Sequence, residues 1–319
     1  IDLEELLERI GRVFGVVWYA PAVKSESLDD LESKILQILR SMNVKKIKID
    51  TRRSDKRFPV TSLDVSRKLG ASARSKLGLK IDLENPDKTV FVEITEDGIY
   101  ASFEKLRGPG GLPIGSSGKV LALLSGSNSA LACWYMMKRG CIVDLLHVHE
   151  GSPEQVFQAK LVSIINKLLE YSLTLKLYLA PMKPFQEASE KVPEKLKDAL
   201  FKLFILRIGE AVAGEMRYSG IVTGVSPTSR EDLNELCEIL QFRNLPVYVP
   251  LLALEDHEIS EQIEKLGFRF EEESSEKSFI EEAVSGELVE EYWMKCRMSE
   301  AVKQALKNLR IFRLRLGEQ

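Results

Sequence analysis

The chain has 319 residues, 44% of them hydrophobic and 29% charged, which is typical of a globular protein and excludes a disordered chain. It is long enough for at least two hydrophobic cores, and no apolar run approaches the roughly 20 residues of a membrane span, so no membrane partner is expected. The net charge is −3, but the charged residues are unevenly distributed along the chain. A basic block at 40–80 has 13 basic and three acidic side chains, whereas the segment 254–300 has 15 acidic and five basic ones.

A one-sided basic block inside an acidic protein favours a surface that binds a polyanion such as nucleic acid. The alternative is a solvated helix face beside an oppositely charged domain. Four scattered cysteines form no close pair, which fits unbridged thiols in a reducing, cytoplasmic compartment and indicates no zinc or redox motif. They are Cys133, Cys141, Cys237 and Cys296.

The first hundred residues alternate between helical and extended patterns. Apolar spacing predicts a helix at 28–41 after the capping residue Ser27, and another after Thr61, which Asp64 can help to cap. Leu63 is expected on the core side of that second helix. The other predicted elements are a helix at 3–12, strands at 13–19 and 46–50, and a hairpin formed by 90–94 and 99–103.

A glycine-rich stretch at 108–118 separates this part from the rest. It fails the phosphate-loop pattern because Val120 follows Gly118 and Lys119, where a serine or threonine is required, so a linker is predicted. Beyond it, apolar strands alternate with helices, which predicts a parallel sheet wrapped by helices. The strands are expected at 120–124, 142–148, 175–179, 220–223, 247–249 and 310–316, and the helices near 130–139, 153–171, 193–217, 230–241, 255–266 and 271–300.

The first strand of this sheet runs into Ser125-Gly126-Ser127-Asn128-Ser129 and then directly into a helix. Small residues expose backbone N–H groups there, and a helix N-terminus favours anions. Alone, such a turn is weak evidence. Four further motifs make it specific: 55–59 (DKRFP), 110–115 (GGLPIG), 118–120 (GKV) and 136–140 (MMKRG). In this order they resemble the tRNA 4-thiouridine synthetase family (ThiI).

The resemblance is close over about 45–145 and thinner to about 270. It implies an α/β protein, in which a THUMP domain with the remnant of a ferredoxin-like segment precedes a PP-loop ATP pyrophosphatase-like, doubly wound parallel sheet. The expected limits are 1–22 for the end of the ferredoxin-like segment, 23–107 for the RNA-binding THUMP domain, 108–118 for the linker, 119–270 for the PP-loop-like domain, and 271–319 for an acidic helix and a basic tail. In the family, THUMP binds the acceptor end of tRNA.

This chain departs from the family at the positions that bind ATP and carry sulfur in the family. The family loop reads S-G-G-x-D-S, whereas this loop is one residue shorter, has a single glycine and carries Asn128 in place of the aspartate, a poorer Mg²⁺ ligand. The sulfur-carrying cysteine positions align with Asp198 and Phe201. The family's G-E-S becomes Gly224-Val225-Ser226, and its arginine before Pro-Leu becomes Val249. These losses predict a degenerate catalytic site.

Other candidate sites are weaker. His147 and His149 would share one face of a strand, but no third metal ligand is evident. Cys133 and Cys141 flank a helix rich in aromatic residues and methionine, and are expected in the core rather than as nucleophiles.

The sequence therefore predicts a tRNA-binding protein that acts in tRNA modification as a binding subunit without catalysis. Its partners would be tRNA and a separate catalytic or sulfur-donor protein, with homodimerisation left open. The alternatives are an active ATP-dependent tRNA sulfurtransferase with an external sulfur donor, which would need ATP and Mg²⁺, and a nucleotide-sensing regulator. No catalytic residue or metal ligand is predicted. The predicted degenerate nucleotide site comprises Ser125, Gly126, Ser127, Asn128, Ser129 and Gly224, and the predicted RNA-binding residues are Arg52, Arg53, Lys56, Arg57, Arg67, Lys68, Arg74 and Lys76.

Overall fold

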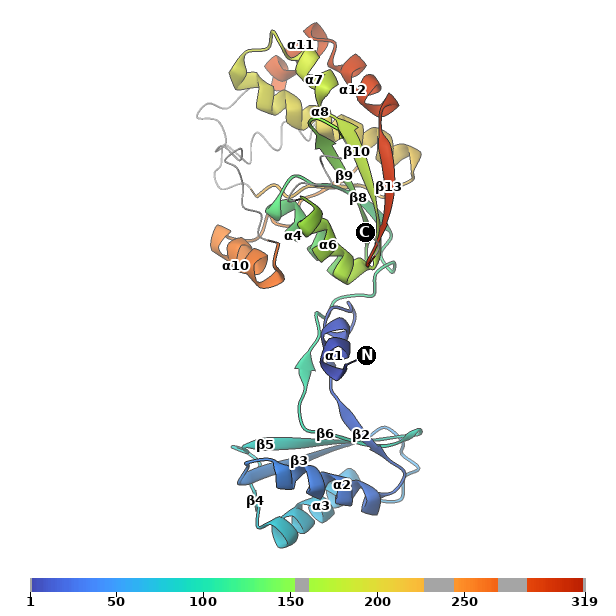
Figure 1. Cartoon of the computed structure of the whole chain (residues 1–319), viewed down its shortest axis with the longest axis vertical. Helices are drawn as coiled ribbons and strands as arrows, with labels where there is room; N and C mark the ends of the chain where they lie inside the picture. Colours follow the sequence, from blue (N-terminus) through green and yellow to red (C-terminus); the bar gives the residue numbers. More distant parts are fainter. Residues whose placement is uncertain (1, 153–160, 227–243, 269–285, 318–319) are drawn as a thin grey trace. The chain divides into compact units, whose positions relative to one another are not determined.

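The computed structural model describes residues 2–152, 161–226, 244–268 and 286–317. The chain divides into two compact units, residues 1–110 and residues 111–319, each with its own hydrophobic core. Figure 1 shows the elements of both units along the chain.

Unit 1 is built on a five-stranded sheet in the order β2-β6-β5-β3-β4. β3 runs parallel to β4 and β5, whereas β6 is antiparallel to both β5 and β2. Two helices, α2 and α3, lie side by side on one face of this sheet (Figure 1). The bounds are β2 Ala22–Ser25, α2 Leu28–Ser41, β3 Lys46–Arg53, α3 Ser62–Leu77, β4 Lys80–Ile81, β5 Lys88–Thr95 and β6 Gly98–Ser102.

The helix caps form as the sequence predicts. The Ser27 side chain accepts a hydrogen bond from the Asp30 amide, and the Thr61 side chain accepts one from Asp64. The expectation for Leu63 is wrong, because its side chain is 59% exposed. The buried face of α3 is set by Val65, four residues before Leu69, and a residue two positions from Val65 points to the opposite side of the helix.

The start of the chain also differs from expectation. α1 covers Leu3–Ile10, but the apolar run after it forms a strand over two residues, β1 Trp18–Tyr19, which pairs with β7 Leu106–Arg107. The helix end continues instead into a turn, where the Val13 amide donates to the Ile10 carbonyl, and Gly15 then adopts φ +94°. An apolar run that contains such a glycine bends rather than extends.

Unit 2 contains a six-stranded sheet in the order β12-β11-β8-β9-β10-β13. The first five strands are parallel, and β13 adds an antiparallel edge to β10. All six strands lie where the sequence predicts them. Their bounds are β8 Lys119–Leu123, β9 Ile142–His149, β10 Thr174–Pro181, β11 Ile221–Val222, β12 Val247–Tyr248 and β13 Arg310–Arg315.

Helices cover both faces of this sheet, as a doubly wound fold requires (Figure 1). One group packs together as α4, α6 and α10, and a second as α7, α8, α11 and α12. The helix predicted at 230–241 lies outside the described residues, as do 153–160 and 271–285 of two other predicted helices. The bounds are α4 Ser127–Lys138, α6 Leu161–Ser172, α7 Lys183–Ala188, α8 Glu194–Glu215, α10 Asp256–Leu266, α11 Gly286–Lys295 and α12 Met298–Lys307.

The topology fixes where a ligand would bind in unit 2. The chain leaves β8 toward β9 on one side, whereas β11 lies on its other side, so the strand order reverses between β8 and β11. In open α/β sheets, the crevice for ligands lies at the carboxyl ends of the strands at such a switch point. The loop 124–129 and residues 223–224 follow these two strands. In the described parts of the chain, no helix combines the length and apolar character that crossing a membrane requires.

Candidate functional site

The loop between β8 and α4 is stabilised by hydrogen bonds between the Ser129 side chain and the loop backbone. The Ser129 hydroxyl donates to the Gly126 carbonyl at 2.7 Å and accepts from the Ser125 and Gly126 amides, each at 2.9 Å. Ser129 is buried, whereas Ser125 is exposed and Asn128 is half-buried. Two backbone donors that could face an anion therefore already have an acceptor inside the protein.

Gly224 lies directly against this loop. A Cβ atom on Gly224 would stand 2.3 Å from the Ser129 amide nitrogen, 2.4 Å from its Cα and 2.7 Å from the Asn128 carbonyl carbon. All three are backbone atoms, so a glycine is needed for this close approach. The structure thus brings together Gly224 and the loop residues that the sequence assigned to one degenerate nucleotide site.

His147 supports the same loop from β9. Its Nδ1 atom lies 2.9 Å from the Leu124 carbonyl oxygen, so this nitrogen carries the proton and donates. Burial lowers the pKa of His147, which favours the neutral imidazole. Among the residues that the structure describes, no group of His, Cys, Asp and Glu side chains could hold a metal ion.

The two residues that the sequence analysis aligned with the family's sulfur carrier, Asp198 and Phe201, make other interactions on α8. Asp198 forms an ion pair with Lys202 at 2.6 Å. The ring of Phe201 lies 5.0 Å from that of Phe185 and 6.5 Å from that of Phe204, measured between centroids. Neither side chain can carry persulfide sulfur, and an aromatic cluster occupies the second position.

Of the cysteines, Cys133 and Cys141 are buried and Cys296 is half-buried, all three with free thiols; Cys237 lies outside the described residues. Burial raises the pKa of Cys133 to about 12 and raises that of Cys141 as well. The expectation that both belong to the core is confirmed. A reactive thiol needs a lowered pKa and solvent access, and neither of these two has them.

Cys133 should therefore be unreactive in the native protein. With a pKa of about 12, roughly one thiol in 10,000 is ionised at pH about 8. Iodoacetamide labelling followed by peptide mass spectrometry should modify Cys296 before Cys133 and Cys141, and should reach all three in denaturant. Native labelling of Cys133 as fast as that of Cys296 would contradict this account.

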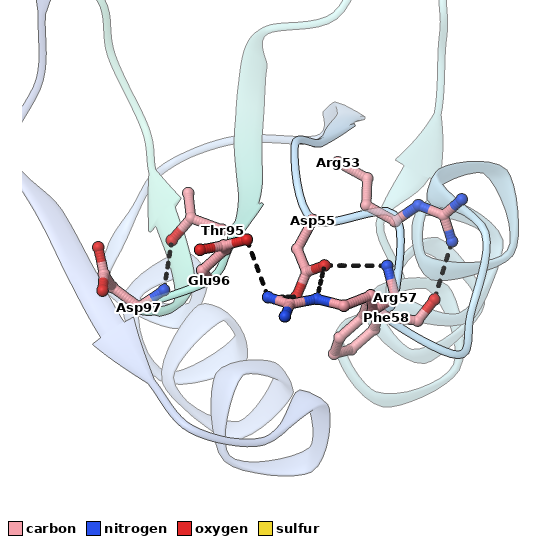
Figure 2. Close-up of polar contacts among 7 residues, drawn as sticks. All are labelled: Arg53, Asp55, Arg57, Phe58, Thr95, Glu96 and Asp97. Atoms are coloured by element: carbon pink, nitrogen blue, oxygen red, sulfur yellow. Dashed lines mark hydrogen bonds and ion pairs between the residues drawn. The ribbon is translucent and has the colours of Figure 1, made fainter.

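The basic block of unit 1 contains a loop that Arg53 holds in place. From the end of β3, the Arg53 Nη1 atom donates to the Phe58 carbonyl at 2.9 Å (Figure 2). The same atom donates to the Val60 carbonyl at 3.0 Å. The guanidinium is partly buried, and Phe58 packs against the core of unit 1. Arg53 therefore shapes the loop 54–60, and its Nη1 atom is engaged within the protein.

Arg57 joins the loop to the β5–β6 turn. It contacts the Asp55 carboxylate through Nε at 3.0 Å and the Glu96 carboxylate through Nη2 at 2.9 Å (Figure 2). The hydrogen bonds from Arg57 lower the pKa of Asp55, and the same contact raises the pKa of Arg57. Arg57 is nevertheless 74% exposed, so it lies on the surface as one member of an ion-paired group.

The remaining predicted RNA-binding residues fall into two groups. The paired group makes contacts to Asp64, Asp29 and Glu32, and its members are Arg67, Lys68 and Lys76. The other group consists of exposed side chains for which no ion pair or hydrogen bond is found within the described residues: Arg52, Lys56 and Arg74. The sequence identifies the block but does not separate these groups.

Two of the site's features were not foreseen in the sequence. The Arg53 contacts to two carbonyls depend on how the chain folds back after β3, and no residue spacing signals that return. The Ser129 hydroxyl had a weak signal, because it stands three residues after the N-cap Gly126, the position from which a polar side chain reaches back in a capping box.

These features define a class of protein: a THUMP domain joined to a PP-loop-type α/β domain. Families described as THUMP domain and as thiamine biosynthesis protein (ThiI) match residues 25–104 and 115–280. The "Probable tRNA sulfurtransferase" of Brevibacillus brevis is 33% identical over 268 residues, covering 81% of this chain and 67% of the relative. That of Thermoanaerobacter pseudethanolicus is 32% identical, covering 83% and 71%. The chain belongs to the ThiI family of tRNA sulfurtransferases.

Solved structures agree on the fold. A 4-thiouridine synthetase in complex with RNA and ATP superposes with a TM-score of 0.84 at 22% identity, covering 98% of this chain and 87% of the other. A protein of Pyrococcus horikoshii Ot3 superposes with a TM-score of 0.65 at 28% identity, covering 83% and 81%. The predicted fold class and family resemblance are both confirmed.

Proposed function

We propose that this chain binds tRNA through unit 1 and positions it for modification, without itself performing ATP-dependent sulfur transfer. The tRNA sulfurtransferase relatives and the RNA-bound 4-thiouridine synthetase support the choice of tRNA as ligand. The single observation that carries the loss of chemistry is the loop 125–129, whose Ser125 and Gly126 amides are held by the Ser129 hydroxyl. The free thiols of Cys133, Cys141 and Cys296 agree with a reducing, cytoplasmic setting.

The loop does not fit a Mg²⁺–ATP complex. Pyrophosphate binding needs unengaged amides on a loop whose glycines admit close approach, and this loop has one glycine and two engaged amides. Mg²⁺ needs hard oxygen ligands with negative charge, and Asn128 offers a neutral amide. No reaction step through ATP is therefore assigned to this chain.

The carrier positions support the same proposal. Sulfur transfer by a carrier needs a thiol that becomes a persulfide, and the aligned residues, Asp198 and Phe201, make an ion pair and an aromatic cluster instead.

The runner-up function is an active sulfurtransferase that takes its sulfur from an external donor. It is favoured by identity of 33% to a relative named as a tRNA sulfurtransferase.

On unit 1, we assign the main phosphate contacts to Arg52 and Lys56. Both are exposed and lack an ion pair within the described part of the chain, so binding a phosphate displaces no carboxylate. The loop 54–60 is held by Arg53 before any ligand arrives, which reduces the ordering cost of binding. Arg57, Lys68 and Lys76 would have to exchange carboxylate partners for phosphates.

Replacing Arg52 and Lys56 together with glutamine should weaken tRNA binding and flatten its salt dependence. Each lost phosphate contact lowers the slope of log affinity against log salt by about 0.7 to 0.9, so the double variant should lose about 1.4 to 1.8. Filter binding or fluorescence anisotropy at several salt concentrations measures this slope.

The matched control is Lys68→Gln with Lys76→Gln, which removes the same charge from residues paired with Asp29 and Glu32. Its slope should change less. Equal slopes for wild type and for Arg52→Gln with Lys56→Gln would move the RNA surface elsewhere. A wild-type chain that binds ATP but no tRNA would instead favour the nucleotide-sensing regulator.

A further inference from the structure

The end of unit 2 carries a second basic segment. Residues 303–317 contain five basic side chains and no acidic one, within a protein whose net charge is −3. The segment comprises the end of α12 and the edge strand β13, which pairs with one neighbour, β10. Because this segment belongs to unit 2, the proposed binding of tRNA by unit 1 does not explain its positive charge.

The register of β13 places like charges opposite each other. Arg313 pairs across the strands with Lys176 of β10, and Arg315 pairs with Thr174. Residues directly opposite in an antiparallel pair have side chains on the same face, where like charges repel and destabilise the sheet. Arg313 and Arg315 also share this face, about 6.8 Å apart along the strand.

The acidic residue on the neighbouring strand β9 forms no ion pair with the side chains of Lys176 and Arg313. Asp144 of β9 is 4% exposed, and its carboxylate accepts from the Tyr218 hydroxyl at 2.6 Å and from the Lys176 backbone amide at 2.7 Å. Across the described ranges of unit 2, no ion pair is found for the side chains of Lys176, Lys307 or Arg313. Arg313 and Lys307 are exposed, and Lys176 is half-buried.

Protection of a sheet edge is a weaker explanation. A charged edge strand does discourage pairing with other chains. One or two charges on β13 would achieve this, and an acidic residue opposite Lys176 would do so while stabilising the sheet. Edge protection does not account for a strand that combines three arginines with a lysine directly across from one of them.

We propose that Lys176 and Arg313, with Lys307 at the end of α12 three residues before β13 begins, form a second phosphate-binding surface for tRNA on unit 2. Arginine and lysine side chains without carboxylate partners bind phosphates at little cost, and arginine can do so with two parallel hydrogen bonds. A phosphate placed between Arg313 and Lys176 would also relieve their repulsion. The inference rests on the proposed function, because it takes tRNA as the ligand of the protein.

The test uses the full chain and two variants. Lys176→Gln with Arg313→Gln removes two of the proposed contacts and should lower the salt-dependence slope for tRNA by about 1.4 to 1.8. Arg313→Glu places an opposite charge across from Lys176, so it should raise or preserve the melting temperature while weakening tRNA binding at least as much. If Arg313 were needed only for structure, its replacement would not lower tRNA affinity while the melting temperature increases.

The control removes two paired charges from the same unit. Lys183→Gln with Lys197→Gln breaks ion pairs to Glu187 and Glu194, and its slope should stay close to wild type. An equal loss in this control, or an unchanged slope in Lys176→Gln with Arg313→Gln, overturns the second surface but leaves unit 1 binding intact. If the variants lose binding to phosphatidylglycerol vesicles and keep tRNA affinity, a lipid surface replaces RNA and the inference fails. A wild-type chain that binds no tRNA overturns the proposed function and the inference together.

Discussion

Replacing Gly224 with alanine is expected to destabilise unit 2 by about 1 to 3 kcal/mol or more, because the added methyl group overpacks a site with no room. The Cβ atom would lie 2.3 Å from the Ser129 amide nitrogen and 2.7 Å from the Asn128 carbonyl carbon. These atoms belong to the first turn of α4, so relief requires movement of the helix start rather than rotation of a side chain. The loop 125–129 should shift with it.

Urea unfolding followed by tryptophan fluorescence measures this effect. A Trp18→Phe background leaves Trp134 and Trp293 as reporters, both in unit 2, and so isolates its transition. The matched control is Gly214→Ala on α8, where a Cβ atom meets nothing within 4 Å. It should stabilise unit 2 by about 0.5 to 1 kcal/mol, because alanine loses less backbone entropy than glycine in a helix. If Gly224→Ala unfolds at the wild-type urea concentration, the close approach of Gly224 to Ser129 is wrong.

Most elements of both units were predictable from the sequence because their apolar spacing is regular and their caps are strong. Helix α2 begins after Ser27 and α3 after Thr61 as predicted, and the strands of unit 2 stand out as apolar runs. The errors came where local patterns compete. The run at 13–19 is apolar enough for a strand, but Gly15 turns the chain inside it.

The candidate site was predictable only in part. Residue identity alone suggested the shortened loop and the loss of carrier cysteines, which stay predictions, since both depend only on which side chains are present. The engagement of the Ser125 and Gly126 amides by Ser129 depends on the backbone path. Likewise, Arg52 and Arg53 differ in their hydrogen bonding only because the loop folds back and brings the Phe58 carbonyl to the guanidinium of Arg53. Adjacent arginines with equal charge thus come to have different roles through tertiary contacts.

The wild-type chain should show no Mg²⁺-dependent binding of ATP near about 10 μM, an affinity that would need roughly 7 kcal/mol of favourable free energy. The loop offers one glycine, two engaged amides and a neutral amide side chain at Asn128. Isothermal titration calorimetry with ATP, with and without Mg²⁺, measures this directly. Tight binding that depends on Mg²⁺ would favour the active sulfurtransferase over the binding subunit.

A gain-of-function variant tests the same explanation of the missing ATP affinity by restoring the loop. Inserting a glycine after Gly126 together with Asn128→Asp restores both the length and the carboxylate of the loop, and it should raise ATP affinity at least tenfold in the presence of Mg²⁺, or about 1.4 kcal/mol. Asn128→Asp alone should gain less, because the shorter loop still holds its amides against Ser129. Even the restored loop should leave 4-thiouridine absent from tRNA, because under the proposed function Asp198 and Phe201 replace the sulfur carrier. Thiolation by the wild-type chain in cells that depend on it would contradict the loss of catalysis, and its persistence after replacement of all four cysteines would identify an external sulfur donor.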